Sequence, residues 1–371
     1  MNDDIAYIEA QSQGLQVQTA NQKLLHIELQ NLVETISVSP AQLEPLRGAA
    51  LGDAVGLELI ESTLLLLYRA LNTIDPSSLK GKNQLQSSSG LGNNALTTVR
   101  ALREKKDLYL NYTFVFLQRL KSYVDPTFGA ALLNTTNALL RNRSSPKSAM
   151  IFDPAIHDAA RTVLWQYSAL MLFAKEVDLN AWQEIIRIYR TRIRSTYHEE
   201  LRTNVAEWRK LGRKATSDEH SALFTTLEKE NESSSGSARK LTVKRSQTLA
   251  KSLRSASDKK RSALDKTQNA SSSPHETFAD AIDEMIPLVC TEQNFIVDFF
   301  HASSQENLNF PDAVTLLSPG QRRGTDLFAR RLLEPDRTMA KVVSDAMDDV
   351  FAAWPTELQS LVEWAVNIHP L

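Results

Sequence analysis

Apolar residues recur every three or four positions along residues 2–37, which is the spacing of one face of an α-helix. The second half of this pattern is apolar, whereas glutamines and Gly14 interrupt the first half. Polar seam residues often select the register or the partner of a coiled coil at a cost in stability. In a heptad frame the a positions are Ile8, Leu15, Gln22, Leu29 and Ile36, and the d positions are Gln11, Gln18, Leu25 and Leu32.

This seam predicts that the first helix packs against helices of another chain. The alternative is a surface helix that packs on its own neighbour in the chain, because a helix of that kind shows similar spacing. We expect the partner-helix interface to consist of Ile8, Leu15, Gln18, Gln22, Leu25, Leu29, Leu32 and Ile36.

A second helical segment follows the first after a short break. The run Ser39-Pro40-Ala41-Gln42 combines a capping serine, a proline at the first helical position and a glutamine that completes a capping box. A helix at about 53–74 then carries leucine and isoleucine on one face, and Asp75-Pro76 ends it. Residues 1–75 are therefore predicted to form a coiled-coil helical hairpin that serves assembly.

The rest of the chain alternates between helical periodicity and polar segments. Residues 76–94 are rich in Ser, Gly and Asn and predict a flexible linker. Periodicity over 95–230 predicts a first helical bundle, and 274–371 predicts the start of a second bundle, truncated at its end. Between them, the basic, Ser-rich residues 231–273 predict disorder. The expected helices include about 95–143 with a possible break at Asp125-Pro126, 179–210, 274–301, 324–334, 336–353 and 355–367.

Composition supports an all-α fold and limits the possible chemistry. The chain has 371 residues, only 12 glycines and a formal net charge of −2, and good helix formers are plentiful. The single cysteine, Cys290, excludes a disulfide within the chain and a multi-cysteine zinc site. Because no signal peptide and no apolar run of 18 residues is visible, we expect a cytosolic protein.

Few residues suggest catalysis or metal binding. Asp298 and His301 can share a helix face close to Glu292, but a metal site needs further ligands at matched geometry. No G-x-G-x-x-G, G-x-x-x-x-G-K-[ST] or G-x-S-x-G motif occurs in the sequence. We therefore expect no catalytic, cofactor-binding or metal-ligating residue and no small-molecule substrate. An unrecognised helical enzyme stays open as a further hypothesis, which a deep polar pocket would support.

The basic segment 239–266 is a candidate contact for anionic lipid. It holds ten Lys and Arg residues, with a few apolar residues among the cations. Each cation near an anionic membrane surface contributes roughly 1 kcal/mol. Nucleic acid is not expected as a partner because aromatic residues for base stacking are missing. The alternative is a solvated linker. The expected lipid contacts are Arg239, Lys240, Lys244, Arg245, Lys251 and Arg254.

Several segments, in order along the chain, resemble one protein family. They include Asp3–Glu9, Gly14–Leu25, Arg103–Lys106, Leu164–Ser168, Ala238–Lys251 and Glu292–His301. These segments are similar to the coiled-coil and C-terminal region of exocyst complex component one, in its fungal form. The resemblance covers nearly all of 1–371. The family's N-terminal pleckstrin-homology-like domain, which binds phosphoinositide and Rho-type GTPases, would precede residue 1, and the family continues past residue 371. The resemblance therefore implies a middle fragment or a truncated gene model.

The resemblance implies a fold and a function. Family members are rod-like stacks of helical bundles of the tethering-complex type, and an N-terminal helix joins a coiled-coil bundle with other exocyst subunits. The complex tethers secretory vesicles to the plasma membrane before SNARE-mediated fusion. A non-catalytic exocyst subunit is therefore our first hypothesis, with a peripheral location at the cytoplasmic face of the plasma membrane. The alternative is a stand-alone membrane-surface adaptor that binds anionic lipid through 239–266.

Overall fold

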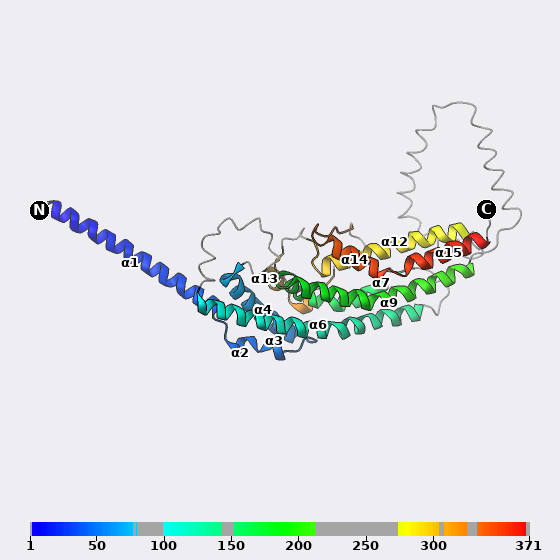
Figure 1. Cartoon of the computed structure of the whole chain (residues 1–371), viewed down its shortest axis with the longest axis horizontal. Coiled ribbons are helices and arrows are strands. Elements are labelled where there is room, and N and C mark those ends of the chain that lie inside the picture. Colours follow the sequence, from blue (N-terminus) through cyan, green and yellow to red (C-terminus); the bar gives the residue numbers. More distant parts are fainter. Residues whose placement is uncertain are drawn as a thin grey trace, which may run out of the picture. The chain divides into compact units, whose positions relative to one another are not determined.

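Helices account for every regular element that the structure describes. The computed structural model describes residues 2–76, 79, 99–142, 152–211, 274–303, 308–324 and 332–368, and no strand occurs in these ranges. Figure 1 shows the helices in sequence colours. The all-α prediction is therefore confirmed for the described part of the chain.

The bounds of the helices follow the sequence pattern closely. The α-helices are α1 (Asn2–Ile36), α2 (Pro40–Leu43), α3 (Pro45–Gly48), α4 (Ala54–Ile74), α6 (Arg100–Asn142), α7 (Ala155–Leu164), α8 (Ser168–Val177), α9 (Leu179–Leu211), α12 (Pro274–Phe299), α13 (Phe310–Leu316), α14 (Ala340–Val350) and α15 (Trp354–Ile368). The 3-10 helices are η3 (Trp165–Tyr167) and η5 (Pro319–Gln321).

Two differences from the expected helices have local causes. Helix α6 continues through Pro126, where the sequence left a break open. A proline inside a helix removes one backbone hydrogen bond, so neighbouring packing has to maintain the helix there. The helix expected from residue 336 begins only at Ala340. Most of the helix expected at 324–334, and nearly all of the expected linker at 76–94, lie outside the described residues.

The chain divides into two units, each built from three separate stretches. Unit 1 comprises Met1–Ala138, Asp153–Thr196 and Val289–Val350, and unit 2 comprises Leu139–Phe152, Tyr197–Leu288 and Phe351–Leu371. The domain limits proposed from the sequence remain predictions.

The core of unit 1 is aromatic. Phe173 of α8 lies between Phe116 of α6 and Phe310 of α13, with ring centroids 6.3 and 5.0 Å away. Tyr68 of α4 packs against the same Phe310 at 5.8 Å. Edge-to-face contacts of this kind stabilise a core beyond the burial of their area. These rings connect four helices that are distant in the sequence.

A buried ion pair adds a polar connection to unit 1. Arg322, just after η5, donates hydrogen bonds to both carboxylate oxygens of Glu61 on α4, at 2.5 and 2.8 Å. The same guanidinium donates to the carbonyl oxygens of Gln166 and Leu317. Burial raises the pKa of the Glu61 carboxyl, although the guanidinium opposes this shift. A buried pair satisfied in this way connects α4 to the segment after η5.

Unit 2 has its own aromatic core. Phe152 lies 5.6 Å from Trp208 of α9 and 5.9 Å from Trp354 of α15. Phe351 lies 4.9 Å from Tyr197 and 4.4 Å from Trp354. The carbonyl oxygen of Tyr197 also accepts a hydrogen bond from the indole N–H of Trp354. These contacts pack the C-terminal part of α9 against α15.

Candidate partner-helix interface

Helix α1 presents its heptad seam to solvent. Every side chain from residue 14 to residue 31 is exposed. Leu15, Leu25 and Leu29 are 58%, 60% and 52% exposed, respectively. No described part of the chain therefore covers this stretch of the seam, as expected for an interface whose partner is another chain.

The remaining seam residues differ in their surroundings. Gln18 and Gln22 are exposed, Leu32 is half-buried, and Ile36 is only 4% exposed. The side chain of Ile8 lies outside the described residues. Ile36 thus contributes to the core of unit 1, because the C-terminal end of α1 packs against α4. The seam therefore passes from solvent into the chain's own core over its last turn.

A tyrosine of α6 fixes the end of α1. The hydroxyl group of Tyr109 donates to the carbonyl oxygen of Ile36 and accepts from the backbone N–H of Val38. The last carbonyls of a helix lack partners within the helix, so a buried end needs a donor from elsewhere. Sequence analysis did not identify this role, since nothing local connects Tyr109 to residues 36 and 38.

The turn between α1 and α4 is held by further polar contacts. Ser39 and Gln42 form the predicted capping box at the start of α2. Arg119 of α6 donates to the carbonyl oxygen of Leu46 at 2.8 Å and to that of Ala49. These contacts brace the base of α1 against α6, so the exposed seam leaves unit 1 in a defined direction.

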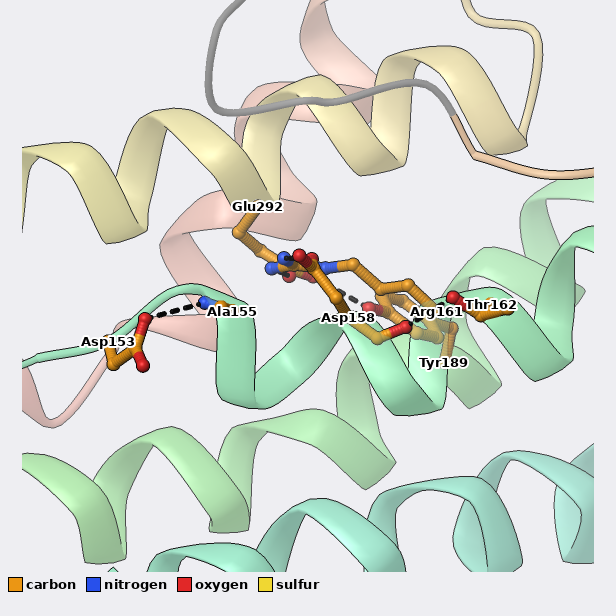
Figure 2. A network of polar contacts seen from close by, with 7 residues as sticks. All are labelled: Asp153, Ala155, Asp158, Arg161, Thr162, Tyr189 and Glu292. Carbon is orange, nitrogen blue, oxygen red and sulfur yellow. Dashed lines mark hydrogen bonds and ion pairs between the residues drawn. The ribbon is translucent and has the colours of Figure 1, made fainter.

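Glu292, one of the residues considered for metal binding, belongs to a buried polar network. Its carboxylate accepts from Arg161 Nη2 at 3.0 Å and from the Tyr189 hydroxyl at 2.8 Å (Figure 2). Arg161 also pairs with Asp158 at 3.2 Å. The Glu292 side chain is fully buried and paired with a cation, so it joins α12 to α7 and α9 rather than presenting an oxygen to solvent.

His301 is separated from that network and makes different contacts. Its Nε2 lies 2.9 Å from the Ser168 hydroxyl and 3.1 Å from the Ser168 carbonyl oxygen. Burial, reinforced by the nearby Lys175 ammonium, lowers the pKa of His301 to about 4. The imidazole is therefore neutral at pH 7. Within the described residues, no three His, Cys, Asp or Glu side chains are grouped so that they could hold a metal ion.

An open groove lies between α6 and α9 in unit 1. Its lining residues are Lys121, Ser122, Asp125, Glu184, Arg187, Ile188, Thr191, Arg192 and Ser195. Asp125 and Arg192 form two hydrogen bonds of 2.7 Å, and Glu184 pairs with Arg187 at 2.7 Å. The hydrogen bond from Arg192 lowers the pKa of Asp125. Because these charges are arranged in pairs, the groove has the chemistry of an exposed ion-pair network.

Two other sequence features have different outcomes. The acidic cluster on α14 is partly paired, since Asp349 lies 3.0 Å from Arg190 Nε. The expected lipid contacts Arg239, Lys240, Lys244, Arg245, Lys251 and Arg254 all lie outside the described residues. Among the described helices, none is both long and apolar enough to cross a bilayer.

Comparison with known proteins gives two matches at opposite ends of the chain. Residues 1–73 match the family model described as exocyst complex component Sec3, coiled-coil, and residues 299–371 match exocyst complex component Sec3, C-terminal. Comparison with curated proteins and with solved structures gave no significant match. The two family matches support a member of the exocyst Sec3 family, whose members are subunits of a vesicle-tethering complex. The first match contains the exposed seam.

Proposed function

We propose that this chain is the Sec3-type subunit of the exocyst, which the sequence resemblance names component one. Its role is to hold other subunits by helix packing while the complex tethers secretory vesicles to the plasma membrane before SNARE-mediated fusion. The proposed location is the cytoplasmic face of the plasma membrane at sites of secretion. The observation that carries this proposal is the exposed seam of α1, within the residues that match the coiled-coil family model.

Energetics favour a partner helix on this seam. Burying one leucine side chain contributes about 1.5–3 kcal/mol, so Leu15, Leu25 and Leu29 together offer several kcal/mol to a partner. A long helix without tertiary contacts is only marginally stable in water, so packing also stabilises α1 itself. The exposed Gln18 and Gln22 would select which helices fit, because a polar seam residue tolerates few registers.

The base of α1 supports an architectural role. Tyr109 and Arg119 tie the region around the end of α1 to α6, which supplies much of the unit 1 core. A bundle built on residues 15–29 would therefore be oriented relative to unit 1. A subunit that joins partners needs this kind of defined connection more than it needs a reactive site.

The alternative of a stand-alone lipid adaptor explains less. It assigns no role to the exposed leucines of α1 and does not account for the match of residues 1–73 to a coiled-coil family. Contact of the basic segment 239–266 with anionic lipid stays a separate proposal within the exocyst role.

The test is the double variant Leu25→Asp with Leu29→Asp in the full chain, purified through a tag from cells that contain the complex. We expect the recovery of the other exocyst subunits to fall at least roughly tenfold, because each aspartate places an unpaired charge in the seam. The matched control is Gln16→Asp with Gln30→Asp, which adds the same charge to the same helix away from the seam. Recovery equal to that of the control would refute the proposal.

A further inference from the structure

A second apolar strip lies on α1, apart from the heptad seam. Val17, Leu24 and Ile27 are 59%, 61% and 53% exposed, and Ala20 between them is exposed as well. Their spacing of three, four and three residues is itself a heptad pattern, at the c and f positions of the original frame. The strip therefore resembles a short coiled-coil seam.

The strip and the seam point in nearly opposite directions. At about 100° per residue, the centre of the strip lies roughly 150° around α1 from the centre of the seam. One partner helix covers only a single face of α1, so a helix on Leu25 and Leu29 leaves Leu24 and Ile27 in water. The strip needs its own occupant.

The rest of unit 1 leaves this strip accessible. Where α1 enters the core, the covered side chains are Leu32 and Ile36, which belong to the seam side. Asn31 and Thr35 are on the strip side at the same level and are exposed. The strip thus points away from the adjoining core, and another helix can approach it without meeting that core.

The charges beside the strip fit a second copy of the same helix. Lys23 lies on one flank and Glu28 on the other, five residues apart, and both are exposed. In a parallel two-stranded coil, flanking residues at this spacing face each other across the interface. Each Lys23 would meet the Glu28 of the other copy, which makes two reciprocal ion pairs. Asn31 continues the series Val17, Leu24 at seven-residue spacing, and a single asparagine there favours one register.

The same composition argues against a membrane surface as the occupant. Between residues 14 and 36 the chain has one Lys and no Arg, together with two glutamates. Attachment of a helix to anionic lipid depends on several cations near the apolar face.

We propose that two copies of this chain pair in parallel through Val17, Ala20, Leu24 and Ile27. The pairing leaves the seam of Leu15, Leu25 and Leu29 free for helices of other subunits, so it goes beyond the proposed function and does not depend on it. Because the strip spans only two heptads, the dimer is weak and dissociates on dilution.

Sedimentation velocity of the purified full chain over a concentration series tests the pairing. We expect the weight-average mass to rise with concentration towards that of a dimer. Leu24→Asp is expected to remove this rise, whereas the seam variant Leu25→Asp retains it. Circular dichroism checks that both variants keep the helical content of the parent. A monomer at every concentration, or a dimer that only Leu25→Asp disrupts, would overturn the proposal.

Charge exchange tests the parallel register. Lys23→Glu alone and Glu28→Lys alone are each expected to weaken the dimer roughly three- to tenfold, because like charges then face each other. The double variant is expected to regain the parent affinity. Equal weakening by the double variant would exclude the parallel register.

Disulfide trapping in a Cys290→Ser background gives an independent readout. Leu24→Cys is expected to form a disulfide between copies under mild oxidation, because in-register seam residues lie within bonding distance. The control is Gln16→Cys, at another exposed position. Trapping of both variants to the same extent would contradict a specific pairing.

Discussion

The Tyr109 hydroxyl lies 2.6 Å from the carbonyl oxygen of Ile36, to which it donates, and 3.1 Å from the backbone nitrogen of Val38, from which it accepts. One side chain of α6 thus satisfies a donor and an acceptor where the chain leaves α1. The exposed seam begins within two turns of this point. Tyr109 is therefore the residue that most directly connects the candidate interface to the core of unit 1.

We expect Tyr109→Phe to destabilise unit 1 by about 1–3 kcal/mol, because it removes a hydroxyl that satisfies two buried backbone groups. Denaturant unfolding measures the loss, and hydrogen exchange of the Val38 amide should become faster. The control is Tyr112→Phe on the same helix, which keeps its ring beneath the Arg47 guanidinium. Equal stability of Tyr109→Phe and this control would show that the end of α1 is held in another way.

The buried pair of Arg161 and Glu292 predicts a larger effect. Glu292→Gln leaves the Arg161 guanidinium buried without its main counter-charge, and breaking a buried pair in this way costs about 3–5 kcal/mol. Chemical denaturation measures the loss. Asp158 also contacts Arg161 but is 62% exposed, so Asp158→Asn is expected to cost less than about 1 kcal/mol. Similar losses in both variants would contradict the assigned roles.

His301 has a left-handed backbone conformation, with φ of 53°. Ala302 N–H donates to the Val297 carbonyl and His301 N–H to that of Asp298, the hydrogen bonds of a helix end that usually holds glycine at this position. We expect His301→Ala to be less stable than His301→Gly by about 1 kcal/mol, because both lose the contact with Ser168 but only alanine is strained. Thermal unfolding of the two variants makes the comparison, and the reverse order would argue against backbone strain.

Glu284 predicts how the stability of unit 2 depends on pH. Burial raises the pKa of its carboxyl to about 7, although a hydrogen bond from the Phe152 N–H opposes this shift. The folded state therefore retains the proton between about pH 4.5 and 7, where the unfolded chain loses it. Stability is fully present below this window and is lost as the pH rises through it, by up to about 1.4 kcal/mol per pH unit.

The measurement is denaturant unfolding of the parent and of Glu284→Gln between pH 4 and 8. Glutamine keeps an oxygen for the Phe152 N–H but carries no titrating proton, so this part of the pH dependence should disappear. An unchanged slope in the variant would assign it to another group.

Local sequence determined the helices of this protein. The three-to-four spacing predicted α1 and α9 to within a residue or two, because helix formation depends on neighbours a few positions away. The capping box of Ser39 and Gln42 was predicted for the same reason. The exposed part of the seam, from Leu15 to Leu29, also follows from spacing, since it makes no contact with the described part of the chain.

Tertiary structure decided which side chains leave that local pattern. Ile36 occupies a seam position yet is buried in the core, and the Tyr109 that completes its helix is 73 residues away. Glu292 resembled a candidate ligand until Arg161, 131 residues distant, was placed against it. Such pairings depend on how helices pack, and packing is set by the sum of many contacts between distant segments, which no local spacing encodes.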